Sequence, residues 1–221
     1  MGRNKYTVEE RDNILKTFIK YTREIMEKDG LDAVSTRKLA ALTGFNSAKL
    51  YFYFKNIDDL VALACVSHTE NYCKMLAEVD RENMDSEAYL YRAWEIFCNC
   101  ALDEPEIYTK LFFTRRETML GDVMNEYYRL YPAEFEKLDE KTRGLLKEGC
   151  IFACSDKVLQ PLVDKGLIKV DKLPIVSELL ISFMGKLLWE RMQSNQGEEQ
   201  KVEMTKRFLD ALKFMLESLG V

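Results

Sequence analysis

Residues 36–55, with the sequence TRKLAALTGFNSAKLYFYFK, constrain the fold of this chain more than any other stretch. They have the pattern of two short helices joined by a tight turn. Ala40 is small enough to let the two helices approach closely, and Gly44 can adopt the positive φ that such a turn requires. Leu50 supplies an apolar contact that holds the second helix against the first. The stretch therefore predicts a helix-turn-helix.

The same stretch is basic. It contains Arg37, Lys38, Lys49 and Lys55 and no acidic residue. Residues 1–56 carry 11 Lys and Arg against 7 Asp and Glu, a net charge of +4; the whole chain has −5, so the remainder carries −9. A basic segment beside an acidic body is expected of a protein that binds the phosphates of DNA locally. Chance clustering is the alternative, because the excess is modest.

The amino-terminal residues resemble the TetR family of bacterial transcriptional regulators. The resemblance covers roughly residues 10 to 62 and is carried by Gly30, Thr36, Leu39-Ala40, Thr43-Gly44, Leu50-Tyr51, Tyr53-Phe54, Lys55-Asn56 and Asp58-Asp59-Leu60. It implies a three-helix head joined by a long helix to a helical body that binds a small molecule and dimerises. It also implies a homodimeric repressor that binds a palindromic operator in double-stranded DNA and is released by its ligand.

The second helix of the motif, at about residues 47–54, is expected to face base edges in the major groove with its amino-terminal residues. Lys49, where the family often has Thr, is the candidate for reading guanine, and a phosphate contact is the alternative. Thr36, Tyr53 and Lys55 suit phosphates. The complete set of expected DNA-binding residues is Thr36, Arg37, Ser47, Ala48, Lys49, Tyr51, Phe52, Tyr53 and Lys55.

Two aromatic residues of that set have a second interpretation. Tyr51 is expected in the core, with a place near the DNA backbone as the alternative. Phe52 suits either a thymine methyl group or an inward position. The expected core of the head consists of Phe18, Ala33, Leu39, Leu42, Leu50, Tyr51 and Phe54.

The rest of the chain has helical periodicity throughout, with no strand pattern and no repeat. The first expected helix begins at the Thr7–Glu10 capping box and ends at Gly30, and a long helix runs from Asn56 towards Asp80. Further helices are expected at 86–101, at 124–131 and at about 133–149, with a helical turn at Pro105. The last of these either continues through 150–165 or breaks at Gly149. Two further helices, starting at Leu173 and after SNQGEE, close the chain. We expect an all-α protein of about nine to ten helices, with domains at 1–56 and 57–221.

Aromatic and sulfur-containing residues of the body are expected mainly in its core, and some of them around an apolar pocket for an apolar or aromatic effector. The pocket candidates are Trp94, Phe97, Cys98, Tyr108, Phe112, Tyr127 and Phe152. A charged ligand could pair with residues 115–117, which are more typical of a solvated charge run. The resemblance implies a four-helix dimer interface with candidates Leu180, Phe183, Met184, Leu187, Phe208, Leu212 and Met215, and burial within one chain is the alternative.

Other functional classes are less favoured by the sequence. One histidine and no nucleophile–base pair or phosphate loop argue against an all-α enzyme. No metal site or cofactor is expected, although Cys98 and Cys100, or Cys150 and Cys154, keep a redox-sensing regulator open as an alternative. A head that no longer binds DNA is disfavoured by Gly44 and the basic residues. The chain has neither a signal sequence nor an apolar run of membrane-spanning length, so we expect a cytoplasmic location.

Overall fold

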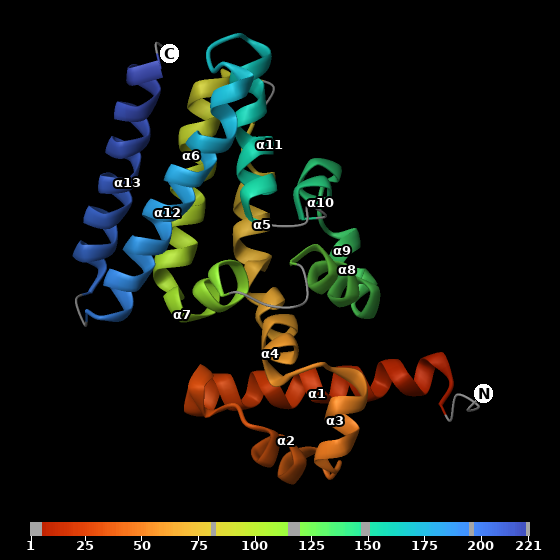
Figure 1. Ribbon diagram of the computed structural model, residues 1–221. Helices are drawn as coiled ribbons and strands as arrows, with labels where there is room; N and C mark the ends of the chain where they lie inside the picture. The colour runs from red at the N-terminus through yellow and green to blue at the C-terminus, as the bar shows by residue number, and fades with distance from the viewer. Residues whose placement is uncertain (1–5, 81–82, 115–119, 147–150, 195–196, 220–221) are drawn as a thin grey trace.

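The computed structural model describes residues 6–80, 83–114, 120–146, 151–194 and 197–219, and the regular structure in these ranges is helical. The predicted all-α fold with an amino-terminal helix-turn-helix is confirmed. Figure 1 shows a small lower part, a larger upper part of roughly upright helices, and α4 between the two. We call residues 6–56 the head and the remaining described residues the body.

The head contains α1 (Val8–Asp29), η1 (Leu31–Ala33), α2 (Thr36–Thr43) and α3 (Ser47–Tyr53). Each α-helix starts at a side chain that accepts a hydrogen bond from a free backbone N–H. Thr7 and Glu10 form the expected reciprocal capping box, with N···O distances of 3.2 and 2.7 Å. Ser35 caps α2, and Asn46 caps α3 at 2.9 Å. Gly44 ends α2 with a φ of 70°, the left-handed conformation that the turn was expected to need.

The core of the head is smaller than predicted. Phe18, Leu39, Leu50 and Phe54 are buried, and the rings of Phe18 and Phe54 meet edge to face at 6.0 Å. Two expected members are instead on the surface: Leu42 is 46% exposed and Tyr51 is 56% exposed. Because α2 and α3 are only about two turns long, each presents one narrow side to the core of the head. Leu39 and Leu50 occupy those sides, which leaves their neighbours in solvent.

The expected long helix after Asn56 is divided into three segments. These are α4 (Ile57–Cys65), the 3-10 segment η2 (Val66–Thr69) and α5 (Glu70–Ala77). Residues 59–65 of α4 are all buried, because α1 packs against one side of the helix and the body against the other. A helix that is apolar on all sides is typical of such an interior position.

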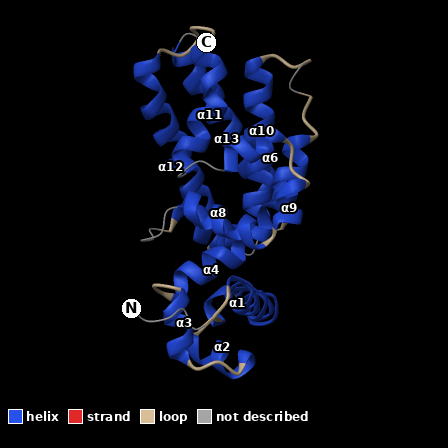
Figure 2. Cartoon of the chain, turned by 90° about the vertical axis from the view of Figure 1, so that its right-hand side faces the viewer, coloured by secondary structure: helices blue, strands red, loops and turns tan. Residues whose placement is uncertain are grey.

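The upper body is built from α6 (Ser86–Asp103), α11 (Ile151–Asp164), α12 (Leu173–Met192), preceded by η4 (Val170–Lys172), and α13 (Glu198–Leu219). The two closing helices are confirmed. Figures 1 and 2 show α6, α12 and α13 packed along one another, and α6 also contacts α11. Among the described helices, none is long and apolar enough to cross a membrane.

The segments between α6 and α11 differ most from expectation. Pro105 starts α7 (Pro105–Tyr108), which runs into a π-helical turn, η3 (Thr109–Phe113). The helix expected at 124–131 begins earlier, as α8 (Leu120–Leu130). The helix expected from 133 to 149 is two short ones, α9 (Pro132–Glu136) and α10 (Glu140–Leu146). Gly149, where a break was considered, lies outside the described residues.

Candidate functional site

The exposed face of the helix-turn-helix lies at the end of the molecule remote from the body (Figures 1 and 2). Ser47, Ala48, Phe52, Arg37 and Lys55 are exposed on the head. Phe52 is 72% exposed, so the inward alternative considered for it is wrong. The surface that these residues form combines positive charge with an aromatic ring, which suits phosphates and thymine methyl groups respectively.

Tyr51 belongs to this surface and not to the core. Its hydroxyl lies 3.3 Å from the Oγ1 of Thr36, the first residue of α2. This contact joins the recognition helix to the amino terminus of α2, where free backbone amides favour a phosphate. The expectation that Tyr51 is a core residue is therefore corrected. Residue 51 follows Leu50, which is buried in the core of the head, and successive helical residues point about 100° apart.

Lys49 is held between two aromatic rings that the sequence did not single out. Its ammonium lies 3.7 Å from the centroid of Phe45 and 5.3 Å from that of Tyr6. Helical side chains lean towards the amino terminus of their helix, which brings residue 49 over residue 45. Phe45 packs in turn on Phe18 at 5.5 Å. A cation–π arrangement thus keeps the positive charge at the tip of α3.

The remaining expected phosphate contact, Tyr53, is less available. Its hydroxyl is buried without a partner among the described residues, and desolvation raises its pKa. Lys38, which was not among the candidates, donates to Asp29 at 2.8 Å and lowers the pKa of that carboxyl. Arg37 and Lys55 are consequently better placed to meet phosphates than either residue.

A set of ion pairs connects the head to the body. Arg129 of α8 makes a bidentate contact with Asp12 of α1 at 2.8 and 2.9 Å, and also binds Glu126. Lys110 of η3 pairs with Asp58 in the first turn of α4. These contacts lie on the side of the head that faces the body, and Arg129 and Glu126 line a hollow there together with Tyr53 and Lys55. Sequence patterns gave no signal for them, because the partners are far apart in the chain.

Tyr127 belongs to this head–body junction and not to a pocket, which corrects the prediction. Its hydroxyl accepts from Arg23 of α1 at 2.8 Å and donates to Glu134 of α9 at 2.5 Å. Arg23 also donates to the carbonyl of Ala64 in α4, at 3.3 Å. Burial is the main reason why the pKa of Tyr127 is raised. The neutral phenol can therefore serve as both donor and acceptor between α1 and α9.

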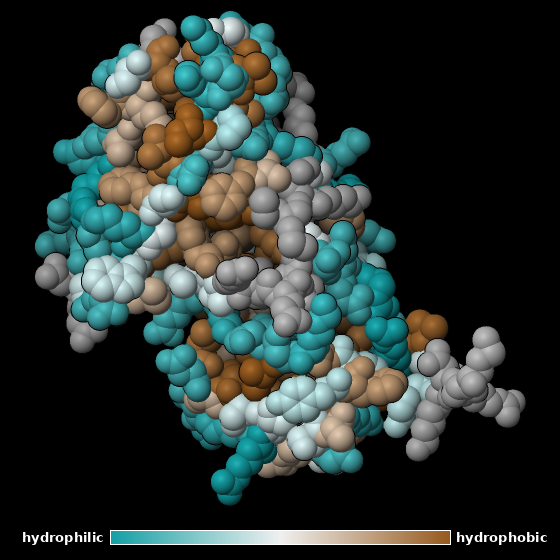
Figure 3. Space-filling model, in the orientation of Figure 1, coloured by the Kyte–Doolittle hydropathy of each residue, from teal (hydrophilic) through white to brown (hydrophobic). Residues whose placement is uncertain are grey.

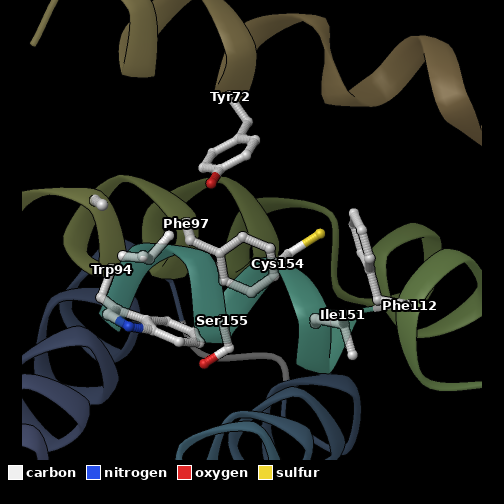
Figure 4. A pocket seen from close by; sticks show the side chains of 9 residues that line it. Tyr72, Trp94, Phe97, Phe112, Ile151, Cys154 and Ser155 are labelled. Atoms are coloured by element: carbon white, nitrogen blue, oxygen red, sulfur yellow. The ribbon is translucent and has the colours of Figure 1, made fainter. Parts of the chain in front are cut away.

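An apolar cavity opens between α5, α6, η3 and α11 (Figure 4). Three of the pocket candidates, Trp94, Phe97 and Phe112, line it together with Tyr72, Ala93, Ile151, Cys154, Ser155 and Val158. The four residues from α11 recur at positions 151, 154, 155 and 158, a helical stripe that could have been found in the sequence. On the face of the body shown in Figure 3, apolar side chains surround a hollow.

The other pocket candidates lie elsewhere. Tyr108 is buried behind Phe97 and Phe112, with ring centroids 5.7 and 5.6 Å away. Cys98 faces the opposite side of α6 and contacts the sulfur of Met184 at 3.7 Å. Phe152 is 44% exposed on the outer side of α11. Residues 115–117, considered for a charged ligand, lie outside the described residues.

Five of the seven dimer-interface candidates are buried within the chain itself, which corrects that prediction. Leu180, Met184, Leu187, Phe208 and Leu212 are 0–2% exposed, whereas Phe183 and Met215 are partly buried. The apolar residues that α12 leaves in solvent are Ile175, Leu179 and Trp189, at 48, 53 and 61% exposure. The inward and outward stripes of α12 are both apolar, so periodicity could not distinguish them.

The described cysteines do not form a redox pair. Cys98 and Cys100 point to different sides of α6, towards Met184 and Asn71 respectively. Burial raises the pKa of Cys73 to about 12 and that of Cys98 above its ordinary value, which keeps both thiols protonated and unreactive. Cys150 lies outside the described residues. Within those residues, no three His, Cys, Asp or Glu side chains are grouped as metal ligands.

Comparisons with known proteins agree with this geometry. Residues 18–64 match the model of the bacterial regulatory proteins of the tetR family. Among solved structures, Thermus thermophilus FadR, a TetR-family repressor in complex with lauroyl-CoA, is 10% identical with a TM-score of 0.57, covering 90% of this chain and 92% of FadR. RolR in complex with resorcinol is 12% identical with a TM-score of 0.54, covering 96% of both chains. A putative TetR-family regulator from Rhodococcus sp. is 13% identical with a TM-score of 0.51, covering 95 and 100%. No protein of curated function matches the sequence significantly.

The Asp12–Arg129 contact generates a prediction about pH. The hydrogen bond from Arg129 lowers the pKa of Asp12, so the native state favours the ionised carboxylate. Its stabilisation is present above the pKa of an unfolded Asp, about 3.9, and is lost as pH falls through the lower native pKa. We expect Asp12→Asn to lower the free energy of unfolding at pH 7 by about 1 kcal/mol, because Arg129 is partly exposed.

Urea unfolding between pH 7 and pH 3 measures this difference. It should shrink at the acidic end of the range, where the wild-type carboxylate becomes protonated as well. Asp32→Asn, at an exposed position of η1, is the matched control and should change the free energy of unfolding little at any pH. A difference for Asp12→Asn that is independent of pH would contradict the assignment.

Proposed function

We propose that this chain, a member of the TetR family, is a transcriptional repressor that binds a palindromic operator as a homodimer and is released by a small molecule. The observation that carries the proposal is the recognition helix α3, whose exposed residues face away from the body. Arg37 and Lys55 flank it with positive charge, and Lys49 adds an ammonium at its tip. Such an arrangement suits a helix in the major groove between phosphates.

Base reading in this proposal depends on few side chains. Ala48 and Phe52 are exposed and apolar, which suits the methyl group of thymine. The ammonium of Lys49, held at the tip of α3, suits a guanine edge or a phosphate near that end of the helix. One head offers little specificity by itself. Two heads related by two-fold symmetry would read two half-sites, about 34–36 Å apart or a multiple of this distance.

The dimer in this proposal uses the solvent side of α12. Ile175, Leu179 and Trp189 follow one another at spacings of four and ten residues, which keeps them on a single side of the helix. A row of exposed large apolar side chains is typical of a surface that another protein covers. A second copy of the chain suits it, because a two-fold axis would set the same row against itself.

Control by a ligand is supported by contacts that connect the residues lining the cavity to α4 and to α13. Phe112 lines the cavity and belongs to η3, in which Lys110 pairs with Asp58 of α4. π-helical turns occur frequently at functional sites. At the other end, Trp94 contacts Phe208 of α13, with ring centroids 4.9 Å apart. A ligand that moves these rings would act on α4, between the head and the body, and on the dimer helices together, which is how differential binding shifts a conformational equilibrium.

Two structures of the same fold have been determined with small molecules bound, lauroyl-CoA in FadR and resorcinol in RolR. They support the proposal that the body of this chain also binds a ligand. They do not identify it, because the sequences are only 10 and 12% identical.

Selection of bound duplexes from a random pool tests the proposed function directly. We expect the full-length protein to enrich a palindromic motif whose half-sites have the spacing given above. Repeating the selection with Lys49→Ala separates the two roles of this lysine. Base reading predicts relaxed preference at defined positions, whereas a phosphate contact predicts weaker binding to all sequences alike. A pool that remains random would refute the proposal.

Arg37 and Lys55 are predicted to supply salt-dependent affinity. Each phosphate contact contributes about one unit to the slope of log affinity against log salt concentration. We expect Arg37→Ala with Lys55→Ala to reduce the slope by about four in a two-headed complex. Lys165→Ala with Lys206→Ala removes the same charge from exposed positions of the body and is the control. Equal slopes for both double variants would rule out the assigned contacts.

The dimer proposal is tested with Leu179→Glu. A carboxylate in the centre of the apolar row would lose hydration in the interface, so the mass should fall from twice 25.8 kDa to 25.8 kDa. Light scattering measures the mass, and operator affinity should fall with it. Val170→Glu, at a position 72% exposed on η4, is the control. A wild-type protein that is monomeric at micromolar concentration would disprove this arrangement.

A further inference from the structure

We propose that the cavity binds an uncharged, ring-containing ligand whose oxygen accepts a hydrogen bond from Trp94, with the hydroxyl of Ser155 as a second partner. The ligand's regulatory role rests on the proposed function, whereas its chemistry follows from the cavity alone. Four observations carry the proposal: two unpaired polar atoms, aromatic walls, uncharged lining residues and a small free volume.

The unpaired atoms are the Nε1 of Trp94, on α6, and the Oγ of Ser155, on α11. Both atoms are buried without a hydrogen-bond partner among the described residues. Trp94 is 6% exposed and Ser155 is 3% exposed. A serine in a helix often donates to the carbonyl four residues earlier, but Ser155 does not bond to Ile151. Buried polar groups in native proteins almost always have partners, so two exceptions at one cavity require an explanation.

The chemistry of these atoms defines what is missing. An indole N–H can only donate a hydrogen bond, so the partner of Trp94 must be an acceptor. A hydroxyl can donate or accept, so Ser155 is compatible with either an acceptor or a donor of the ligand. A ligand without a polar atom would leave both groups unpaired. Uncharged acceptors such as carbonyl and hydroxyl oxygens are therefore groups that this cavity can recognise.

The walls of the cavity favour a ring. Phe97 contacts both Trp94 and Phe112 edge to face, with centroids 5.7 Å apart in each pair, and Tyr72 contacts it at 5.5 Å. Figure 4 shows Trp94 and Phe112 towards opposite ends of the labelled group, with Ser155 on the same ribbon as Cys154 and Ile151. Aromatic side chains arranged in this way can receive a further ring edge to face or offset.

Charge is disfavoured in the cavity. Each of the nine described lining residues has an uncharged side chain. Burial also raises the pKa of Tyr72 well above its ordinary value, which keeps this phenol neutral. A carboxylate or ammonium entering the cavity would lose its hydration without an opposite charge to replace it. The ligand should consequently be neutral where it meets these residues.

The small size of the cavity explains why such a ligand would change the conformation of the body. Its free volume is about 50 Å³, which holds a few water molecules. A benzene ring is known to fill an engineered apolar cavity of about 150 Å³. A ring-containing ligand therefore needs α6, α11 and η3 to separate. It binds an expanded state better than the ligand-free state, which is the condition for a population shift.

A pair of isosteric probes tests the hydrogen bond without any change to the cavity. Acetophenone has a carbonyl oxygen where α-methylstyrene has a methylene group, and benzoate adds a charge to a similar ring. In Trp189→Phe protein, Trp94 is the single tryptophan, and its fluorescence reports binding. We expect acetophenone to bind about tenfold tighter than α-methylstyrene, and benzoate to bind more weakly than either. Light scattering verifies that this background keeps the wild-type assembly.

Two substitutions assign the preference to named atoms. Trp94→Phe keeps a ring but removes the N–H, so calorimetry should find most of the preference for the ketone lost, with the remainder due to Ser155. Val8→Ala, at a position 75% exposed in α1 and remote from the cavity, is the control and should leave the tenfold ratio unchanged. Ser155→Ala should reduce the ratio in part. Thermal unfolding of each variant shows whether it keeps the native state. If a variant does not fold, the comparison of acetophenone with α-methylstyrene in protein that retains Trp94 and Ser155 still tests the proposal.

Three results would overturn the inference. They are equal affinity for acetophenone and α-methylstyrene, tightest binding of benzoate, and failure of both neutral probes to bind at millimolar concentration. The proposed function fails separately, if duplex selection yields no motif. A protein that prefers acetophenone but binds no DNA would retain this ligand site and refute the regulator. A protein that binds an operator but does not prefer acetophenone would support the regulator and refute this ligand site.

Discussion

The burial of residues 59–65 of α4 is the constraint on which the rest of the structure depends. Residues 60–65 are at most 4% exposed, because α1 covers one side of the helix and η3 and α8 cover the other. The apolar run of residues 60–65 is unfavourable in water on every side, so the head and the body both pack on it. The three-helix head is thereby fixed to the body through a shared element, and no flexible linker separates them.

Polar contacts around α4 determine how the two parts are oriented. Arg129 binds Asp12, Arg23 reaches both Tyr127 and Ala64, and Lys110 binds Asp58. Partly exposed ion pairs of this kind contribute little stability individually, but their geometry is specific. Apolar packing would tolerate small rotations of α1 over α4, whereas a bidentate contact does not. These contacts therefore favour one orientation of the head over the body.

Local signals were read correctly from the sequence because they involve residues close together in the chain. The Thr7–Glu10 capping box and the positive φ of Gly44 each depend on a few neighbouring atoms. Predictions of burial were wrong where a helix has apolar residues on two sides and only one side can face the core. Tyr51, Leu42 and the inner stripe of α12 were assigned to the wrong side, since periodicity identifies an apolar face without naming what it meets.

The sequence by itself determined the helical class, the helix-turn-helix and the basic head, because caps, turn residues and charge are local properties. Only the tertiary structure decided that Lys49 lies between Tyr6 and Phe45, that Tyr127 joins α1 to α9, and that Trp94 and Ser155 meet at one cavity. These sites combine residues from helices distant in the chain. Their positions follow from how helices pack on the buried α4 and on α6, and no local pattern encodes that packing.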